Sequence, residues 1–206
     1  PDVTAPLTRK LLFLHPASAW ASFAAYFVVF AASIALLNER DNRYDRAGRA
    51  AAEVGFALNT VALLTGTLWG LQEWSDEGQA PLATIYSEPK VLVVLVLWLT
   101  FAAYLLLRRL VDGPERRARM AAAFGVLGFL AVPASFVTSR LLQTSLHPDI
   151  AGPGANPDAA VGREVGLILA WSLVAFILLF LALFLERLRL LAAEERLEEL
   201  EELREA

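Results

Sequence analysis

The chain has 206 residues, of which 57% are hydrophobic, and its mean hydropathy is +0.51. A soluble domain of this length is less apolar, so the composition indicates an integral membrane protein that resides in a lipid bilayer. The formal net charge is −4, which does not favour a nucleic-acid partner, and the absence of cysteine excludes disulfides and thiolate metal sites.

Five apolar stretches are candidates for crossing a bilayer, which takes roughly 20 residues in a helix. The predicted spans are residues 16–37, 50–69, 91–107, 120–138 and 165–185. The second is the weakest, because it carries Glu53 near one end, where the carboxylate could reach the interface. We therefore expect an all-α bundle of five transmembrane helices within a domain of residues 1–186. A sixth, N-terminal helix is expected to be absent or to lie outside this sequence, which starts at Pro1.

The arginines predict the orientation of these spans through the positive-inside rule. Four arginines lie between the first two spans, and five lie between the third and the fourth. The external loops are then residues 70–90, whose one basic residue is Lys90, and residues 139–163. The charged segment 187–206 follows the last span and is expected to be a cytoplasmic helix. The segment is either solvated or docked on a partner, since it is too short to establish a coiled coil.

The chain contains two histidines, and this orientation brings both to the external side. His15 precedes Pro16 at the start of the first span, and His147 precedes Pro148 in the loop after the fourth. A residue before proline is disfavoured in a helix, while proline itself suits a first helical turn. We therefore expect His15 to cap its helix with its ring facing the interface, and His147 to lie outside a helix.

Two histidines at one depth suggest a shared ligand, although a single interfacial histidine commonly has none. A structural zinc site requires four ligands. Here Asp149 and the carboxylates of loop 70–90 would have to provide the ligands other than the two histidines. An iron porphyrin requires two axial imidazole ligands and an apolar, aromatic binding pocket. Trp69 and Trp74 lie at the start of this loop, where aromatic residues are otherwise common membrane anchors.

The order of these motifs resembles the haem-handling proteins of cytochrome c biogenesis, most closely the haem exporter C (CcmC) type with its tryptophan-rich motif. The resemblance covers most of the chain, and these residues match its motifs: Leu14, His15, Trp20, Thr65, Gly66, Trp69, Gly70, Trp74, Ser87, Glu88, Pro133, Ser139, Leu146 and His147. The sequence departs from the family in having no tryptophan in the loop after Trp74, and Leu142 and Gln143 where tryptophans usually precede the second histidine.

The resemblance implies non-covalent binding of haem b, with His15 and His147 as the axial ligands of the iron. It implies that Trp69, Trp74, Tyr86 and Trp20 contribute to the porphyrin site. It further implies a multi-pass protein of the bacterial inner membrane that is not an enzyme and presents haem to a periplasmic haem chaperone during cytochrome c maturation. An ABC-type ATPase and its membrane subunits are the implied partners, and any ATP use belongs to them because this chain has no Walker A pattern.

Two alternatives remain from the sequence. The first is a haem-free structural subunit of a membrane transporter complex, which the small number of tryptophans in the loop favours. The second is a membrane redox protein that retains haem b and passes electrons.

Overall fold

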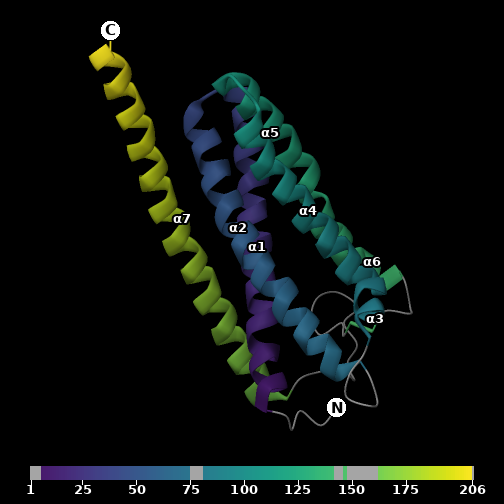
Figure 1. Ribbon diagram of the computed structural model, residues 1–206. Coiled ribbons are helices and arrows are strands. Elements are labelled where there is room, and N and C mark those ends of the chain that lie inside the picture. The colour runs from purple at the N-terminus through teal and green to yellow at the C-terminus, as the bar shows by residue number, and fades with distance from the viewer. Residues whose placement is uncertain (1–5, 75–80, 142–145, 148–161, 206) are drawn as a thin grey trace.

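The apolar segments of the chain form long helices, which satisfy their backbone hydrogen bonds internally as a bilayer requires. The computed structural model describes residues 6–74, 81–141, 146–147 and 162–205. Within these ranges the helices are α1 (Pro6–Glu39), α2 (Asn42–Glu73), α3 (Leu82–Ser87), α4 (Pro89–Leu110), α5 (Pro114–Phe129), α6 (Ala131–Leu141) and α7 (Arg163–Glu205) (Figure 1).

Five helical stretches of the described residues are long and apolar enough to cross a membrane. They are Lys10–Glu39, Asn42–Glu73, Pro89–Leu110, Pro114–Thr138 and Arg163–Glu205. Each contains one of the predicted spans, which confirms the all-α architecture with five spans. The fourth comprises α5 and α6, which are separated at Leu130. Pro133 accounts for this break, because it has no N–H to donate to the carbonyl of Phe129 and its ring crowds that carbonyl.

The predicted start of the first helix at Pro16 is wrong. The helix α1 begins at Pro6, so both His15 and Pro16 lie inside it. The Ser18 hydroxyl donates to the carbonyl oxygens of Leu14 (2.8 Å) and His15 (3.0 Å). Pro16 leaves the carbonyl group four residues earlier without its helical donor, and membrane helices tolerate such an internal proline. The histidine therefore projects from the body of a helix and does not cap one.

A row of small residues on α2 allows α1 to pack closely against it. Gly48, Gly55 and Ala62 lie seven residues apart, a spacing that keeps them on one face of the helix. A Cβ atom at Gly55 would lie 2.9 Å from the Cβ of Ala25 on α1, and one at Gly48 would lie 3.7 Å from that of Ala32. Small residues at such contacts let membrane helices approach and gain van der Waals energy.

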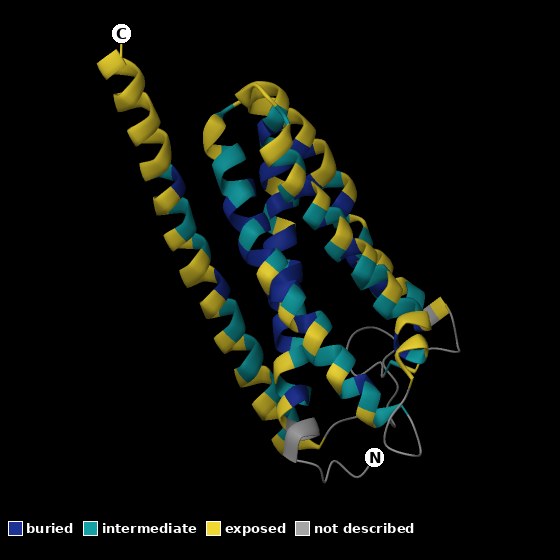
Figure 2. Cartoon of the chain, viewed as in Figure 1, coloured by how far each residue is buried: buried dark blue, intermediate teal, exposed yellow. Residues whose placement is uncertain are grey.

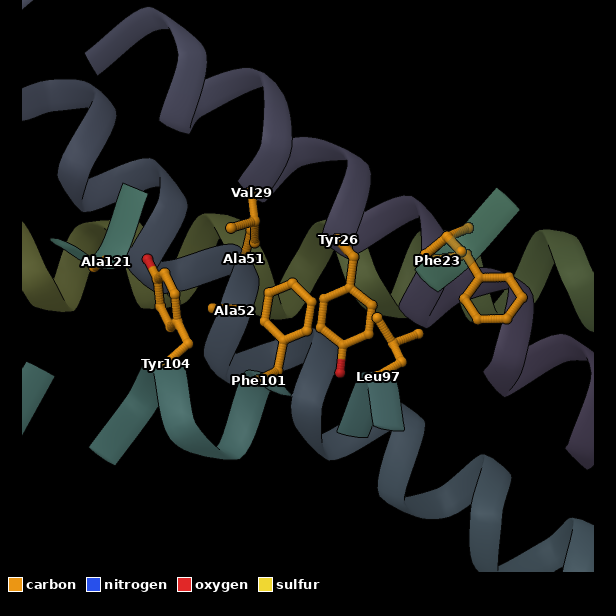
Figure 3. Packing of buried hydrophobic residues seen from close by; sticks show 10 residues of the cluster. Phe23, Tyr26, Val29, Ala51, Ala52, Leu97, Phe101, Tyr104 and Ala121 are labelled. Carbon is orange, nitrogen blue, oxygen red and sulfur yellow. The ribbon is translucent and has the colours of Figure 1, made fainter. Parts of the chain in front are cut away.

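The helix α4 packs against α1 and α2 and completes the core. The rings of Tyr26 on α1 and Phe101 on α4 are stacked, with centroids 3.7 Å apart and planes 14° from parallel (Figure 3). Leu97 and Tyr104 of α4 are buried in the same cluster. This packing places the start of α4 beside the end of α2.

The long helix α7 lies on the outside of the bundle and contacts α1 and α2. Most of its residues are exposed, and its large apolar side chains, such as Trp171, are available to lipid (Figure 2). Glu53 on α2 accepts hydrogen bonds from Arg49 (3.0 Å) and from Arg187 on α7. The negative charge of Glu53, which made residues 50–69 the weakest predicted span, is therefore paired. The charged segment from residue 187, which the sequence predicts to be helical, continues this helix to Glu205.

The connections of the bundle lie at its two ends. The α1–α2 and α4–α5 connections lie at one end, and the starts of α1, α4 and α7 lie at the other, with the end of α2 and with α3 (Figure 1). Residues far apart in the sequence therefore meet at this second end.

Enlarging Gly55 should destabilise the bundle. In Gly55→Val the added side chain would overlap Ala25 and Tyr26, and overpacking of this kind costs about 1–3 kcal/mol. We expect a lower thermal unfolding midpoint in detergent. Gly162→Ala is the control, because a Cβ there would meet nothing within 4 Å. Equal midpoints for the two variants would contradict close α1–α2 packing.

Candidate functional site

The His15 ring lies between α1 and α2, half-buried, and its Nδ1 atom is 2.8 Å from the carbonyl oxygen of Ala62. A carbonyl oxygen accepts hydrogen bonds and cannot donate, so Nδ1 carries the proton and donates it. The neutral ring then has its lone pair on Nε2. Metal-binding histidines commonly hold their second nitrogen in this way, because the bond orients the ring and sets the tautomer.

Gly66 provides the space for this ring. A Cβ atom at Gly66 would lie 2.6 Å from Cε1 and 2.7 Å from Nδ1 of His15. Real atoms do not approach so closely, so a side chain at this position would displace the imidazole. Gly66, which matches one of the family motifs, thus has a structural reason to be small, since it lets the ring lie against the backbone of α2.

The second histidine lies next to the first. The ring centroids of His15 and His147 are 6.1 Å apart, and their planes are inclined by 51°. Two imidazoles on opposite sides of one metal ion, each with a bond of about 2 Å, place their centroids roughly 6 Å apart. The separation therefore fits two axial ligands of a single ion. The prediction that His147 lies outside a helix is confirmed, since Leu146 and His147 belong to none.

Glu88 holds the segment that carries His147. This residue precedes α4, its exposed fraction is 3%, and its Oε2 atom accepts the backbone N–H of Leu146 at 3.0 Å. A buried carboxylate is costly unless it is hydrogen-bonded, so this contact offsets part of the cost of burying it. The sequence singled out Glu88 as a motif match, but only the tertiary contact reveals that it positions the residue before the second histidine.

Aromatic rings extend from the histidines along the end of α2. Trp74 packs edge-on against His147, with centroids 6.4 Å apart, and Trp69 packs edge-on against Trp74 at 5.9 Å. Both indoles are half-buried. A flat, apolar ligand can stack on or lie beside such surfaces. Four of the six predicted site residues therefore form one connected group of rings.

The other two predicted residues lie at the edges of this group. The Tyr86 hydroxyl is 3.3 Å from Oγ1 of Thr67, and the side chain is 40% exposed. Trp20 packs against Phe136, with ring centroids 5.2 Å apart. Phe136 also lies under the ammonium group of Lys90, at 5.8 Å. The connection from Trp20 to the histidines therefore runs through two residues that the sequence did not identify.

Lys90 is the charged group next to the two rings. Its Nζ atom lies 3.5 Å from Nδ1 of His147, and the side chain is half-buried in the first turn of α4. One signal in the sequence could have identified it, since Lys90 is the only basic residue of loop 70–90.

The donor set of the site consists of two imidazoles. Among the described residues, no three His, Cys, Asp or Glu side chains are grouped so that they could hold a metal ion. Asp149, which the zinc alternative required, lies outside the described residues. A six-coordinate haem iron would need only two ligands from the protein, because the porphyrin supplies four nitrogens. The two imidazoles would provide these ligands, and the neighbouring aromatic side chains would provide an apolar surface. The residues present therefore fit a haem.

Removing the Glu88 carboxylate should loosen the His147 segment. In Glu88→Ala the N–H of Leu146 loses its charged acceptor, and a hydrogen bond to a charged group contributes about 1.5–3 kcal/mol. We expect a lower thermal midpoint in detergent and faster proteolysis between α6 and α7. Glu88→Gln keeps an acceptor oxygen and should lose less. Equal losses in the two variants would show that the negative charge matters and the hydrogen bond does not.

The chain is similar to several proteins with assigned names. It is 31% identical over 182 residues to a "Heme exporter protein C" of Bradyrhizobium diazoefficiens, and the alignment covers 88% of this chain and 66% of that relative. The protein of the same name from Paracoccus denitrificans is 27% identical, over 88% of this chain and 72% of the relative. A "Cytochrome c biogenesis protein CcsA" from Synechococcus is 29% identical over 52% of this chain and 31% of the relative. The chain thus spans just under two thirds of the length of the Bradyrhizobium protein.

The sequence profile described as "Cytochrome C assembly protein" matches residues 1–147, well over half of the chain. The matched region ends at the second histidine and contains α1 to α6. The resemblance inferred from the two histidines and the loop between them is therefore confirmed. Together with its five apolar helices, the match shows that this chain is a multi-pass membrane protein of the cytochrome c assembly protein family.

Proposed function

We propose that this protein binds haem between His15 and His147 at the external face of the membrane and presents it to a periplasmic haem chaperone during cytochrome c maturation. The observation that carries the proposal is the pair of imidazoles with centroids 6.1 Å apart. The family membership and the names of the relatives support it, since these proteins are named for haem export and cytochrome c biogenesis.

The two ligands differ in how firmly the fold holds them. His15 projects from the body of a packed helix, with its Nδ1 proton donated to Ala62. His147 lies outside the helices, and the Glu88 hydrogen bond attaches the preceding residue, Leu146, to the start of α4. This asymmetry suits transfer, because a ligand outside the helices can release the iron while a ligand on a packed helix retains it. Haem is cargo in this function, and no bond of the porphyrin is broken.

The arginine-rich connections support the external location of the site. Four arginines lie in and around the α1–α2 connection and five near the α4–α5 connection, at the end of the bundle opposite the histidines. The positive-inside rule assigns that end to the cytoplasm. In the proposed orientation the histidines face the periplasm and the charged end of α7 lies in the cytoplasm. There it would be accessible to an ABC-type ATPase and its membrane subunits.

Visible spectra of the purified protein test the proposal. Protein from haem-sufficient cells should show a Soret band and, when reduced, the sharp bands of a low-spin haem with two imidazole ligands. We expect His15→Ala and His147→Ala each to remove this low-spin signature, and the double variant to lose the haem. Trp171→Ala removes a 71% exposed ring on α7 and is the control that should leave the spectra unchanged.

The outcome separates the proposal from its alternatives. A wild-type protein that contains no haem and binds none when it is added would contradict the proposal and favour a haem-free structural subunit. A haem that titrates reversibly with a defined potential but is never transferred to a chaperone would favour the redox alternative.

Acid should weaken haem binding. Neutral imidazole is the ligating form, so a proton and the iron compete for Nε2 of each histidine. We expect the apparent affinity to fall once the solution is acidic enough to protonate the imidazoles. Below its own pKa, each histidine that must lose a proton contributes about a tenfold loss of affinity per pH unit. Absorbance titrations between pH 5 and pH 8 measure the effect, and a pH-independent affinity would argue against imidazole ligation.

A further inference from the structure

Lys90 occupies an unusual position for a cation. It lies in the first turn of α4, where the partial positive charge of the helix N-terminus disfavours it. It is also one of two lysines in a chain whose other sixteen basic residues are arginines. A residue that breaks a local preference is commonly found at a functional site.

The contact with Lys90 favours opposite tautomers for the two histidines. A lysine ammonium group can only donate hydrogen bonds, so the Nδ1 atom of His147 that faces it at 3.5 Å is favoured as the unprotonated nitrogen. The proton of the neutral ring then lies on Nε2, the nitrogen that a metal would need. In His15 the carbonyl of Ala62 places the proton on Nδ1 and leaves Nε2 available. The first histidine is therefore ready to ligate, and the second is not.

We propose that Lys90 is the binding group for a porphyrin carboxylate, and that this carboxylate, by drawing the ammonium group away from His147, frees the second ligand. The inference rests on the proposed function, because it presumes that haem is the molecule that reaches His15. Once the ammonium group has moved, solvent supplies a proton to Nδ1 and removes the one on Nε2. The ring then stays neutral, with its lone pair on Nε2, and no net charge is transferred.

The chemistry of lysine suits this role. Its charge is compact and lies on a flexible four-carbon stem, so it can exchange one acceptor for another at little cost. The aromatic face of Phe136, 5.8 Å from the ammonium group, can accommodate the cation in the ligand-free protein. A dicarboxylate porphyrin would thus be ligated by both histidines only when one of its carboxylates is correctly seated. This requirement makes Lys90 a specificity-determining residue.

The inference can be tested with two porphyrins that differ only in their carboxylates. Haem-free wild-type protein in detergent is titrated with ferric protoporphyrin IX and with its dimethyl ester, and the absorbance reports both affinity and spin state. We expect the free acid to bind about tenfold more tightly, since a charge-assisted hydrogen bond is lost in the ester. The free acid should give a low-spin complex ligated by both histidines. The ester should give a high-spin complex ligated by His15 alone.

Neutral replacements of Lys90 should remove this difference. In Lys90→Met, and in Lys90→Gln if the first variant folds poorly, the two porphyrins should bind with similar affinity, and both complexes should be low-spin. A low-spin ester complex in the variant would also show that the ester groups do not themselves obstruct His147. Lys10→Met is the matched control, because it removes the other lysine, an exposed residue at the same end of the bundle, and should behave as the wild type.

Two results would overturn the inference while leaving the proposed function intact. One is a Lys90 variant that keeps the wild-type preference for the free acid. The other is a wild-type ester complex that is already low-spin and becomes high-spin in His147→Ala. If the wild type binds neither porphyrin, the proposed function fails, and this inference fails with it.

Discussion

The close approach of α1 to α2 is the constraint on which the rest of the structure depends. Gly48, Gly55 and Ala62 lie on one face of α2, and Gly66 follows one turn later. Ala32 and Ala25 of α1 meet the first two of these positions, and His15 meets the last two. The same contact that stabilises the bundle therefore positions the first histidine. Its ring occupies the place that a side chain on α2 would otherwise fill, and the backbone of α2 sets its tautomer.

The second half of the site depends on where α4 begins. Packing of Tyr26 on Phe101 fixes α4 against α1 and brings its first turn to the end of α2. Glu88 and Lys90 flank the proline that starts this helix, and they act on neighbouring parts of one segment. Glu88 holds the backbone at Leu146, while Lys90 faces the ring of His147. Two residues of opposite charge thus contact the backbone before the second histidine and its ring.

Several ion pairs between described residues lie toward the end of the bundle away from the histidines. Arg108 makes a hydrogen bond of 2.7 Å to Asp45 between α4 and α2, and Glu53 joins α2 to Arg187 of α7. Pairing offsets the cost of placing these charges near a bilayer. The histidine end is held by close packing, by aromatic contacts and by hydrogen bonds such as those from His15 to Ala62 and from Leu146 to Glu88.

The sequence by itself determined the five spans, because hydropathy summed over about 20 residues outweighs any one polar group. The two histidines and the loop between them were enough to indicate the family, and the arginines predicted that His15 and His147 share one depth. The tertiary structure decided what depends on contacts between distant segments. It placed Pro16 inside the helix α1, which runs from Pro6 to Glu39. It also placed Lys90 beside a residue 57 positions away, because the pairing of α4 with that segment follows from the packing of whole helices and leaves no local pattern.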